Sequence, residues 1–214
     1  MGGFLDELGA NGPSWRRQMI RRRYTRGEPI FHEGEVGDTF HVIEKGRVLV
    51  EVSTVRGEVA ALAVRGPGEI IGELAIVGGG RRTARVTALE PTETLSLTRE
   101  RLDVLRRDDP HVDRRLLEIL AERLSETMAQ LMEVLFTSVE TRVLRVVLRL
   151  ADSFDEGTDP IVIRVRQEDI AAMAGTRRQT ANRPLKAAEA AGAIVVGRGR
   201  VELLDRDLLE ALAR

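Results

Sequence analysis

Residues 31–43 read FHEGEVGDTFHVI, and this stretch decides the fold of the first half of the chain. Gly34 and Gly37 predict a turn that needs positive φ angles, and the residues after them predict a strand. Short apolar runs such as RVLVEV and AALAV recur between residues 24 and 97, with glycines between them. Short strands separated by glycine turns are typical of a barrel or a sandwich.

The composition excludes several classes of protein. The chain has 214 residues, a net charge of −1 and no cysteine, so disulfides, thiol catalysis and cysteine-ligated metals are excluded. No apolar run is long enough to cross a membrane, and the opening MGGFLDELGA lacks a signal-peptide core. We therefore expect a cytoplasmic protein with no membrane association.

Catalytic and metal-binding patterns are equally weak. The histidines at positions 32, 41 and 111 are dispersed, so we predict no metal site and expect buried, hydrogen-bonded or surface histidines instead. No pair of nucleophile and base predicts an enzyme. Trp15 is expected to serve packing.

The stretch from 70 to 84, IIGELAIVGGGRRTA, combines groups that suit a sugar phosphate. Its glycine-rich turn offers backbone amides, and Arg82 and Thr83 can hold an anionic phosphate. The carboxylate of Glu73 can accept a hydrogen bond from a ribose hydroxyl. An exposed arginine beside a loop is the alternative interpretation.

From Pro110 the pattern changes to that of a long helix. The first and fourth positions of successive heptads are occupied by Leu117, Leu120, Leu124, Thr127, Leu131 and Val134. This pattern predicts a helix over 111–136, about 39 Å long, that pairs with a second copy of the chain. A helix packed only on its own barrel is the alternative, and we predict the homodimer.

A domain boundary is predicted at Thr137-Ser138-Val139-Glu140, which has the form of a capping box and should begin a helix from Ser138 to Ser153. A strand is expected over 161–165, two short helices within 167–175 and 176–192, and a hairpin over 193–205. This order predicts a winged helix-turn-helix.

Three features of the helix-turn-helix carry further predictions. Ala171 is small enough for a close helix crossing, and Gly175 supplies the tight turn. Thr176 and Gln179 predict a capping box at the start of the second helix. Pro184 predicts a kink or an early end near Ala181.

The second helix and the hairpin carry side chains suited to DNA. Arginine can read guanine, glutamine and asparagine can read adenine, and arginines on the hairpin can hold phosphates. The candidate DNA contacts are Arg177, Arg178, Gln179, Asn182, Arg183, Arg198 and Arg200. Base contacts should concentrate on Arg178, Gln179 and Arg183. A small helical bundle with solvated arginines is the alternative.

In motif and order, residues from about 24 to 204 resemble the cyclic-AMP receptor protein/FNR family of bacterial transcription regulators. FHEGEVGDTFHVIEKGRV is similar to the start of the family's β-roll, GEL…RRTA to its phosphate-binding cassette, and GTRRQTANRPLK to its recognition helix. The resemblance implies an α+β fold. It consists of a cyclic-nucleotide-binding β-roll (a double-stranded β-helix jelly roll) at 1–109, a dimerisation helix at 110–136 and a winged helix-turn-helix at 137–214.

The resemblance also implies cyclic AMP as an allosteric ligand. The cyclic phosphate and ribose would be held by Gly72, Glu73, Leu74, Arg82 and Thr83. Thr127 lies where the family has its adenine-contacting threonine, and the heptad pattern independently places it in the dimer seam. Implied partners are RNA polymerase and a double-stranded DNA operator with near-palindromic half-sites.

Met128, Gln179 and Pro184 depart from the family pattern. Gln179 replaces a glutamate that reads cytosine, and glutamine favours adenine instead, which leaves a different target sequence open. Met128 replaces a serine common in cyclic-AMP responders, which leaves a ligand-independent state open. Besides cyclic-nucleotide control, we therefore retain a constitutive, ligand-independent regulator and a nucleotide-binding module that acts on a partner protein. Cyclic GMP is also open as the ligand. A cupin-like enzyme lacks the clustered His and Glu ligands it would require.

Overall fold

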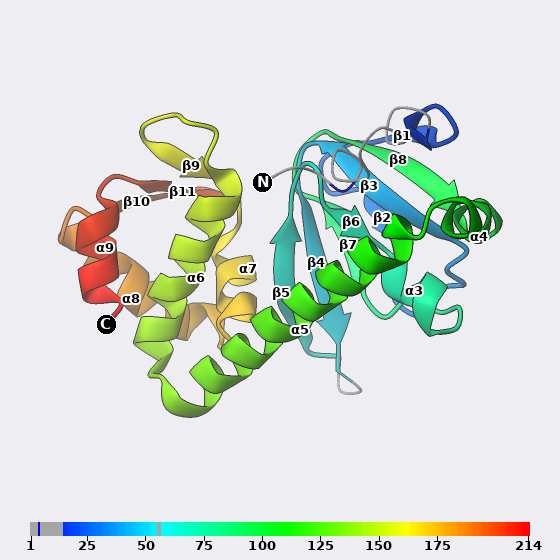
Figure 1. Cartoon of the computed structure of the whole chain (residues 1–214). Helices are drawn as coiled ribbons and strands as arrows, with labels where there is room; N and C mark the ends of the chain where they lie inside the picture. Colours follow the sequence, from blue (N-terminus) through cyan, green and yellow to red (C-terminus); the bar gives the residue numbers. More distant parts are fainter. Residues whose placement is uncertain (1–3, 5–14, 55–56) are drawn as a thin grey trace. The chain divides into compact units, whose positions relative to one another are not determined.

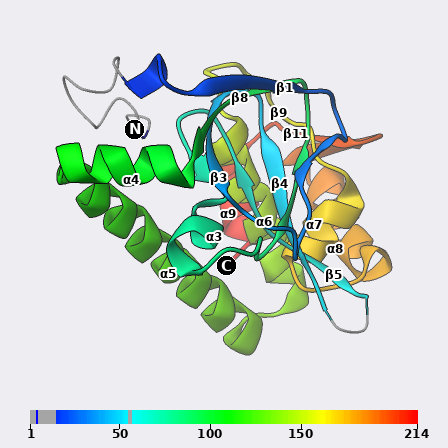
Figure 2. The same ribbon diagram turned by 90° about the vertical axis from the view of Figure 1, so that its right-hand side faces the viewer.

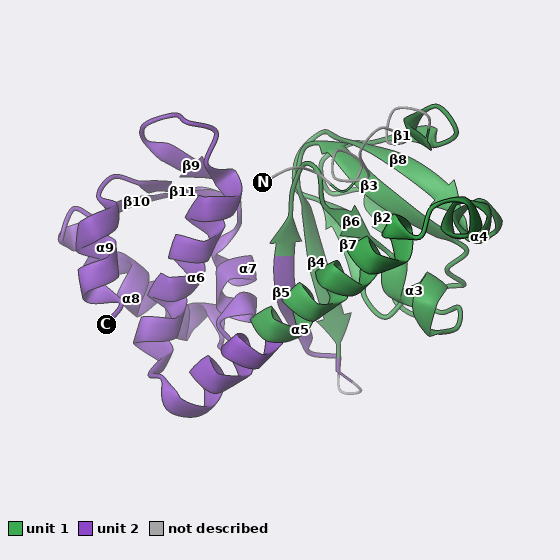
Figure 3. Ribbon diagram, viewed as in Figure 1, with its two compact units in different colours: residues 1–53, 64–126 green, residues 54–63, 127–214 purple. Residues whose placement is uncertain are grey.

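The computed structural model describes residue 4, residues 15–54 and residues 57–214. Most of the opening segment, for which the sequence predicts no export signal, lies outside these residues. The chain divides into two compact units, one of residues 1–53 and 64–126 and one of residues 54–63 and 127–214 (Figure 3).

The first unit is built on two four-stranded sheets, with the strand orders β1-β8-β3-β6 and β2-β7-β4-β5 (Figure 1). The strand pairs β1–β8, β2–β7, β3–β6, β3–β8 and β4–β7 are antiparallel. The strands are β1 Ile20–Tyr24, β2 Pro29–Phe31, β3 Thr39–Lys45, β4 Val48–Ser53, β5 Val59–Arg65, β6 Ile70–Ile71, β7 Arg85–Ala88 and β8 Thr92–Thr98. The predicted β-roll of short strands and glycine turns is confirmed.

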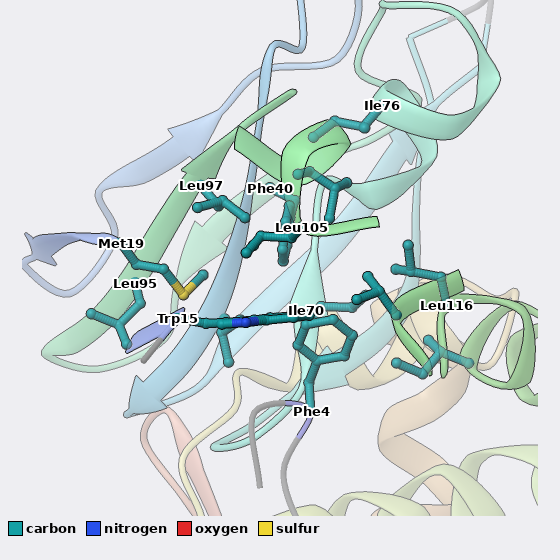
Figure 4. Close-up of a cluster of buried hydrophobic side chains, with 14 residues drawn as sticks. Phe4, Trp15, Met19, Phe40, Ile70, Ile76, Leu95, Leu97, Leu105 and Leu116 are labelled. Carbon is teal, nitrogen blue, oxygen red and sulfur yellow. The ribbon is translucent and has the colours of Figure 1, made fainter. Parts of the chain in front are cut away.

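Strand β3 is buried on both of its faces, which explains why its sequence is apolar without regular alternation. Ile43 packs in a cluster with Phe31, Val48, Ile71 and Val86, which come from both sheets. Phe40 and Val42 belong to a second cluster that includes Trp15 and residues of the helices (Figure 4). Trp15 is thus a packing residue, as expected.

Of the helices whose bounds fall in the described residues, α3 Glu73–Gly78, α4 Arg99–Asp108 and α5 His111–Phe136 belong wholly or in part to this unit. Helix α4 and the start of α5 cover the sheet that contains β3 and β8 (Figure 2). Leu102 and Leu105 of α4 pack there with Val112 and Leu116 of α5. The predicted limits of the long helix are confirmed, whereas α4 was not predicted.

The first two glycines that decide the fold serve different purposes. Gly34 has a φ of +84°, as predicted. Gly37 does not have a positive φ, so the predicted conformation of this second glycine is wrong. A Cβ on Gly37 would lie 2.4 Å from the Cβ of Ala75, so glycine is required there by the close approach of α3.

The second unit contains α6 Val139–Phe154, β9 Ile161–Ile163, α7 Gln167–Met173, α8 Arg178–Ala190, β10 Ile194–Gly197, β11 Arg200–Leu203 and α9 Arg206–Leu212. The three strands form an antiparallel sheet in the order β10-β11-β9. Helices α7 and α8 with the β10–β11 hairpin form a winged helix-turn-helix, as predicted. Helix α9 was not predicted.

The structure corrects both predicted helix caps. Helix α6 is capped by Ser138, whose hydroxyl accepts a hydrogen bond from the amide of Thr141, so the Thr137–Glu140 box is wrong. Helix α8 has Arg177 at its N-cap with no side-chain hydrogen bond, so the Thr176–Gln179 box is also wrong. In each case the helix begins later than the motif requires.

The predicted early end of the recognition helix is wrong as well. Helix α8 continues past Pro184 to Ala190. Pro184 is buried, together with Ala181, Leu185 and Ala188 on the same face. Packing along this face stabilises the helix despite the hydrogen bond that proline cannot donate.

Candidate functional site

Arg82 is held inside the first unit by backbone carbonyls of two different segments. Its side chain is 5% exposed, and Nη1 donates to the carbonyls of Thr39 (2.6 Å) and Gly72 (3.0 Å). Nη2 donates to the Thr39 hydroxyl at 2.9 Å. The guanidinium carbon lies 4.1 Å from the centre of the Phe31 ring. These contacts fix the cation in place, and burial lowers the pKa of Arg82 without neutralising it at ordinary pH.

Gly72 allows the close approach of this arginine. Its φ is +82°, and a Cβ there would lie 2.3 Å from Nη1 of Arg82. Glycine adopts this conformation without steric penalty and leaves room for the guanidinium. The next residue, Glu73, begins helix α3.

Glu73 is 3% exposed, and its Oε1 accepts a hydrogen bond from Arg123 of α5. Arg123 also donates to the carbonyl of Ile70. Arg123 was not among the predicted site residues, although its position four residues before Thr127 on the same helix could have indicated it.

Two buried polar atoms of this region have no hydrogen-bond partner: Oε2 of Glu73 and Nε of Arg82. Leaving a buried polar group without a hydrogen-bond partner is costly, so these two atoms are candidates to contact a ligand. The two atoms differ in chemistry, because one is an acceptor and the other a donor. Together they fit a ligand that offers both a hydroxyl and an anionic oxygen.

The other predicted pocket residues lie in less buried places. Leu74 is 44% exposed on α3, and Thr83 is exposed directly after Arg82. Thr127 is exposed on α5 and belongs to the second compact unit. The structure therefore brings Gly72, Glu73 and Arg82 together, with Thr39 as an additional contact.

His41 is a buried, hydrogen-bonded histidine. Its Nδ1 lies 3.1 Å from the hydroxyl of Thr94, and its side chain is near Phe31. Burial, reinforced by the charges of Arg82 and Arg22, lowers the pKa of His41 to about 4. Within the described part of the chain, no cluster of three metal-ligating side chains occurs.

Helix α5 has two apolar faces. Val112, Leu116 and Ile119 are buried against the first unit. The residues of the predicted seam lie on a different, exposed face: the side chains of Leu117, Leu124 and Leu131 are 66%, 59% and 57% exposed. Met128 and Val134 are also exposed. A surface of this kind indicates a binding partner.

Helix α8 presents one buried and one exposed face. Its buried residues recur at three- and four-residue intervals, so they form a single stripe against the unit. The opposite face carries the predicted Arg178, Gln179, Asn182 and Arg183, of which Asn182 is half-buried and the others exposed. Lys186, which the sequence analysis did not include, is exposed on the same face. Arg177 is exposed at the N-cap.

The hairpin presents the remaining two candidates. Arg198 lies in the turn between β10 and β11 and is exposed, as is Arg200 at the start of β11. Nε of Arg200 is 2.9 Å from a carboxylate oxygen of Glu202. A phosphate at Arg200 would therefore compete with Glu202, whereas Arg198 has an exposed turn position.

The comparisons with known proteins agree with this geometry. Residues 21–109 match the family described as cyclic nucleotide-binding domain, and residues 141–212 match the Crp-like helix-turn-helix domain. No helix among the described residues has the length and apolar character to cross a lipid bilayer.

Full-length relatives share both parts. The chain is 36% identical to the cyclic AMP receptor protein of Thermus thermophilus over 193 residues, which cover 90% of this chain and 88% of that protein. It is 33% identical to the CRP-like cAMP-activated global transcriptional regulator of Mycobacterium tuberculosis over 79% of this chain and 77% of that protein. The structure of the c-di-GMP responsive global regulator CLP of Xanthomonas campestris aligns with a TM-score of 0.76 at 22% identity, covering 94% and 98%. The chain therefore belongs to the cyclic-AMP receptor protein/FNR family of transcription regulators.

Proposed function

We propose that the protein is a homodimeric transcription regulator whose affinity for its operator is controlled by cyclic AMP bound in the β-roll. The observation that carries the proposal is the pair of buried, unsatisfied atoms on Glu73 and Arg82. Both sit where the family resemblance puts the ribose and the cyclic phosphate. The same division into β-roll (1–109), dimerisation helix (110–136) and DNA-binding domain (137–214) underlies the proposal.

Each pocket residue has a distinct task. Arg82 would donate from Nε to a phosphate oxygen, and the Thr83 hydroxyl would donate to the same group. Glu73 would accept from the ribose hydroxyl, while Gly72 and Leu74 supply the backbone around it. The ligand adds a fixed negative charge and a purine, and Thr127 on α5 would contact the purine at the dimer seam.

The proposed homodimer rests on the exposed heptad face of α5. Leu117, Leu124 and Leu131 form a stripe with the period of a two-stranded coiled coil. A second copy of the chain matches this stripe because the same residues recur on it in the same register. Two recognition helices could then reach successive major grooves, about 34 Å apart.

Cyclic AMP is the ligand we favour because two relatives with at least 33% identity are named for it. Control by this ligand requires that it bind the DNA-competent arrangement more tightly than the other. A tenfold change in DNA affinity corresponds to about 1.4 kcal/mol of coupling. As a regulator of transcription, the protein would act in the cytoplasm and contact RNA polymerase.

Calorimetry tests the ligand assignment. We expect cyclic AMP to bind the wild type, and Arg82→Ala to weaken binding at least a hundredfold. Arg81→Ala is the matched control, because Arg81 is exposed and donates to the carbonyl of Gly34 outside the pocket. No binding to the wild type at millimolar cyclic AMP would reject the ligand. Cyclic GMP and c-di-GMP, titrated in parallel, would then identify a different nucleotide.

Operator gel shifts test the DNA contacts and separate the alternatives. Arg178→Ala should relax base preference, whereas Arg198→Ala and Arg200→Ala should weaken all sequences alike and reduce the salt dependence of binding. Equal losses across sequences for all three would contradict the roles. Tight binding that cyclic AMP leaves unchanged would favour the constitutive regulator. If a binding selection on random duplex DNA enriches no sequence, the module that acts on a partner protein is favoured.

A further inference from the structure

Arg142 on α6 joins two backbone segments that are far apart in the sequence. Its side chain is buried, and Nη1 donates to the carbonyl of Thr137 at 2.9 Å. Its Nε donates to the carbonyl of Ala174 at 3.0 Å. Thr137 follows the last residue of α5, and Ala174 is the C-cap of α7. One guanidinium therefore connects the end of the long helix to the turn of the helix-turn-helix.

The Ala174 carbonyl is available because the local turn bonds use other carbonyls. The amide of Thr176 donates to Ala171 (2.9 Å), and the amide of Gly175 donates to Ala172 (3.2 Å). These two bonds form a Schellman motif around Gly175, whose φ is +61°. Arg142 then satisfies the carbonyl at the C-cap, where the helix dipole also favours a positive charge.

The carbonyl of Thr137, the second acceptor of Arg142, is likewise not used by a local backbone hydrogen bond of α5. The amide of Thr137 donates to the carbonyl of Glu133 as the final bond of α5 (2.9 Å), which leaves its carbonyl beyond the helix. The cation thus lies at the C-terminal ends of two helices at once. Arginine suits this position because its rigid, planar fork holds several donors in fixed directions, which the single ammonium of lysine does not.

A second set of contacts ties α5 to α6 on the other side of the chain reversal. Glu133 of α5 is 2.8 Å from Nη1 of Arg149 and 3.6 Å from Nη1 of Arg145, both on α6. These ion pairs tie the last turn of α5 to the middle of α6. From there, Arg142 is a direct polar link to α7, whose turn sets the position of α8.

We propose that Arg142 is a positioning residue that couples the end of α5 to the recognition helix. A change at Thr137 is passed through the guanidinium to Ala174 and so to the turn that begins α8. The inference rests on the proposed function, because it assigns the path by which a signal on α5 alters DNA binding.

The test uses Arg142→Lys and Arg142→Gln in the full-length protein. Arg206→Gln is the matched control, because it removes an ion pair with Asp152 of α6 in the same unit but touches neither Thr137 nor Ala174. Three quantities are measured for each: the Kd for cyclic AMP, the operator Kd with and without saturating cyclic AMP, and amide hydrogen exchange. Thermal melting monitors folding. If Arg142→Gln does not fold, the result for Arg142→Lys decides the test.

We expect both Arg142 variants to bind cyclic AMP within threefold of the wild type. The ratio of operator Kd values without and with nucleotide should fall to within twofold of one, while Arg206→Gln keeps the wild-type ratio. Cyclic AMP should still alter exchange at Thr137 but no longer at Gly175 and Thr176. A purely structural role would weaken DNA binding in both states and leave the ratio intact, and that result would overturn the inference.

Failure of the Arg142 link can be distinguished from failure of the proposed control by cyclic AMP. A wild type that shows no cyclic AMP binding or no effect on DNA rejects the proposed control. Exchange in the unliganded protein then decides the role of Arg142. Its loss should accelerate exchange at both Thr137 and Gly175 at least tenfold but leave the separate turn at Gly192 unchanged. Acceleration at only one of the two positions would overturn the link.

Discussion

Gly72 and Gly27 offer a matched pair for testing how closely Arg82 is packed. Both have a φ of +82°, but a Cβ on Gly27 has nothing within 4 Å, whereas one on Gly72 would collide with Arg82. We expect Gly27→Ala to cost only the left-handed backbone penalty, about 1–2 kcal/mol. Gly72→Ala should be less stable than that and should lose cyclic AMP binding at least tenfold. Urea unfolding and calorimetry measure the two effects, and equal behaviour of both variants would contradict this packing.

His41 should make the stability of the protein fall in mild acid. Its pKa is lowered to about 4 in the folded chain from an ordinary value of 6.5. The unfolded chain therefore binds a proton first, and the stabilisation is complete above pH 6.5 and falls as the pH drops toward 4. From pH 7 to pH 5 the loss should be about 2 kcal/mol.

Urea unfolding of His41→Gln at both pH values checks this prediction. The variant should lose about 2 kcal/mol less than the wild type over that interval. His32→Gln, which changes an exposed histidine, is the control. An identical acid response in the wild type and His41→Gln would show that another group is responsible.

At the scale of the element, the start of α6 depends on one hydroxyl. Ser138 accepts a hydrogen bond from the amide of Thr141 at 3.2 Å. Ser138→Ala should lower the free energy of unfolding by about 1 kcal/mol, while Thr137→Ala, one residue outside the cap, should have a smaller effect. Thermal denaturation of both variants distinguishes the two residues. A larger loss for Thr137→Ala would restore the capping box expected from the sequence.

The elements that could be predicted from sequence are those with a long or repeated pattern. Helix α5 was predicted from 111 to 136 because its heptads extend over its whole length and Pro110 precedes it. Helices α4 and α9, which are ten and seven residues long, were not predicted, whereas the equally short α7 was predicted as part of the helix-turn-helix pattern. Pro184 predicted an early end of α8 that the structure does not show, because local propensity does not report the burial of Ala181, Leu185 and Ala188.

The candidate site shows the same division. Glu73 and Arg82 were predicted because their residue types and neighbouring glycines suit phosphate and sugar binding, and because this stretch resembles the family's phosphate-binding cassette. Thr39 and Arg123 were not, because they reach Arg82 and Glu73 across 43 and 50 residues of sequence. Such contacts depend on tertiary packing, which a single sequence does not display.

At the scale of the whole molecule, the proposed dimer predicts a defect that the monomer fold would not show. Leu124→Glu with Leu131→Glu places charges on the exposed seam of α5. Sedimentation should show a monomer, with an unchanged circular dichroism spectrum and operator affinity lowered at least a hundredfold. Ser125→Glu, one residue off the seam, should remain dimeric. Monomeric wild-type protein at micromolar concentration would refute the pairing.

The unsatisfied atoms on Glu73 and Arg82 have a consequence for fragments of the nucleotide. Inorganic phosphate could satisfy only Nε of Arg82, and free ribose could satisfy only Oε2 of Glu73, so each fragment leaves one buried polar atom without a hydrogen-bond partner. A molecule that joins both halves relieves the two penalties together. Its binding free energy should therefore exceed the sum for its separate pieces, and a cell rich in phosphate or in sugars would not trigger the protein by accident.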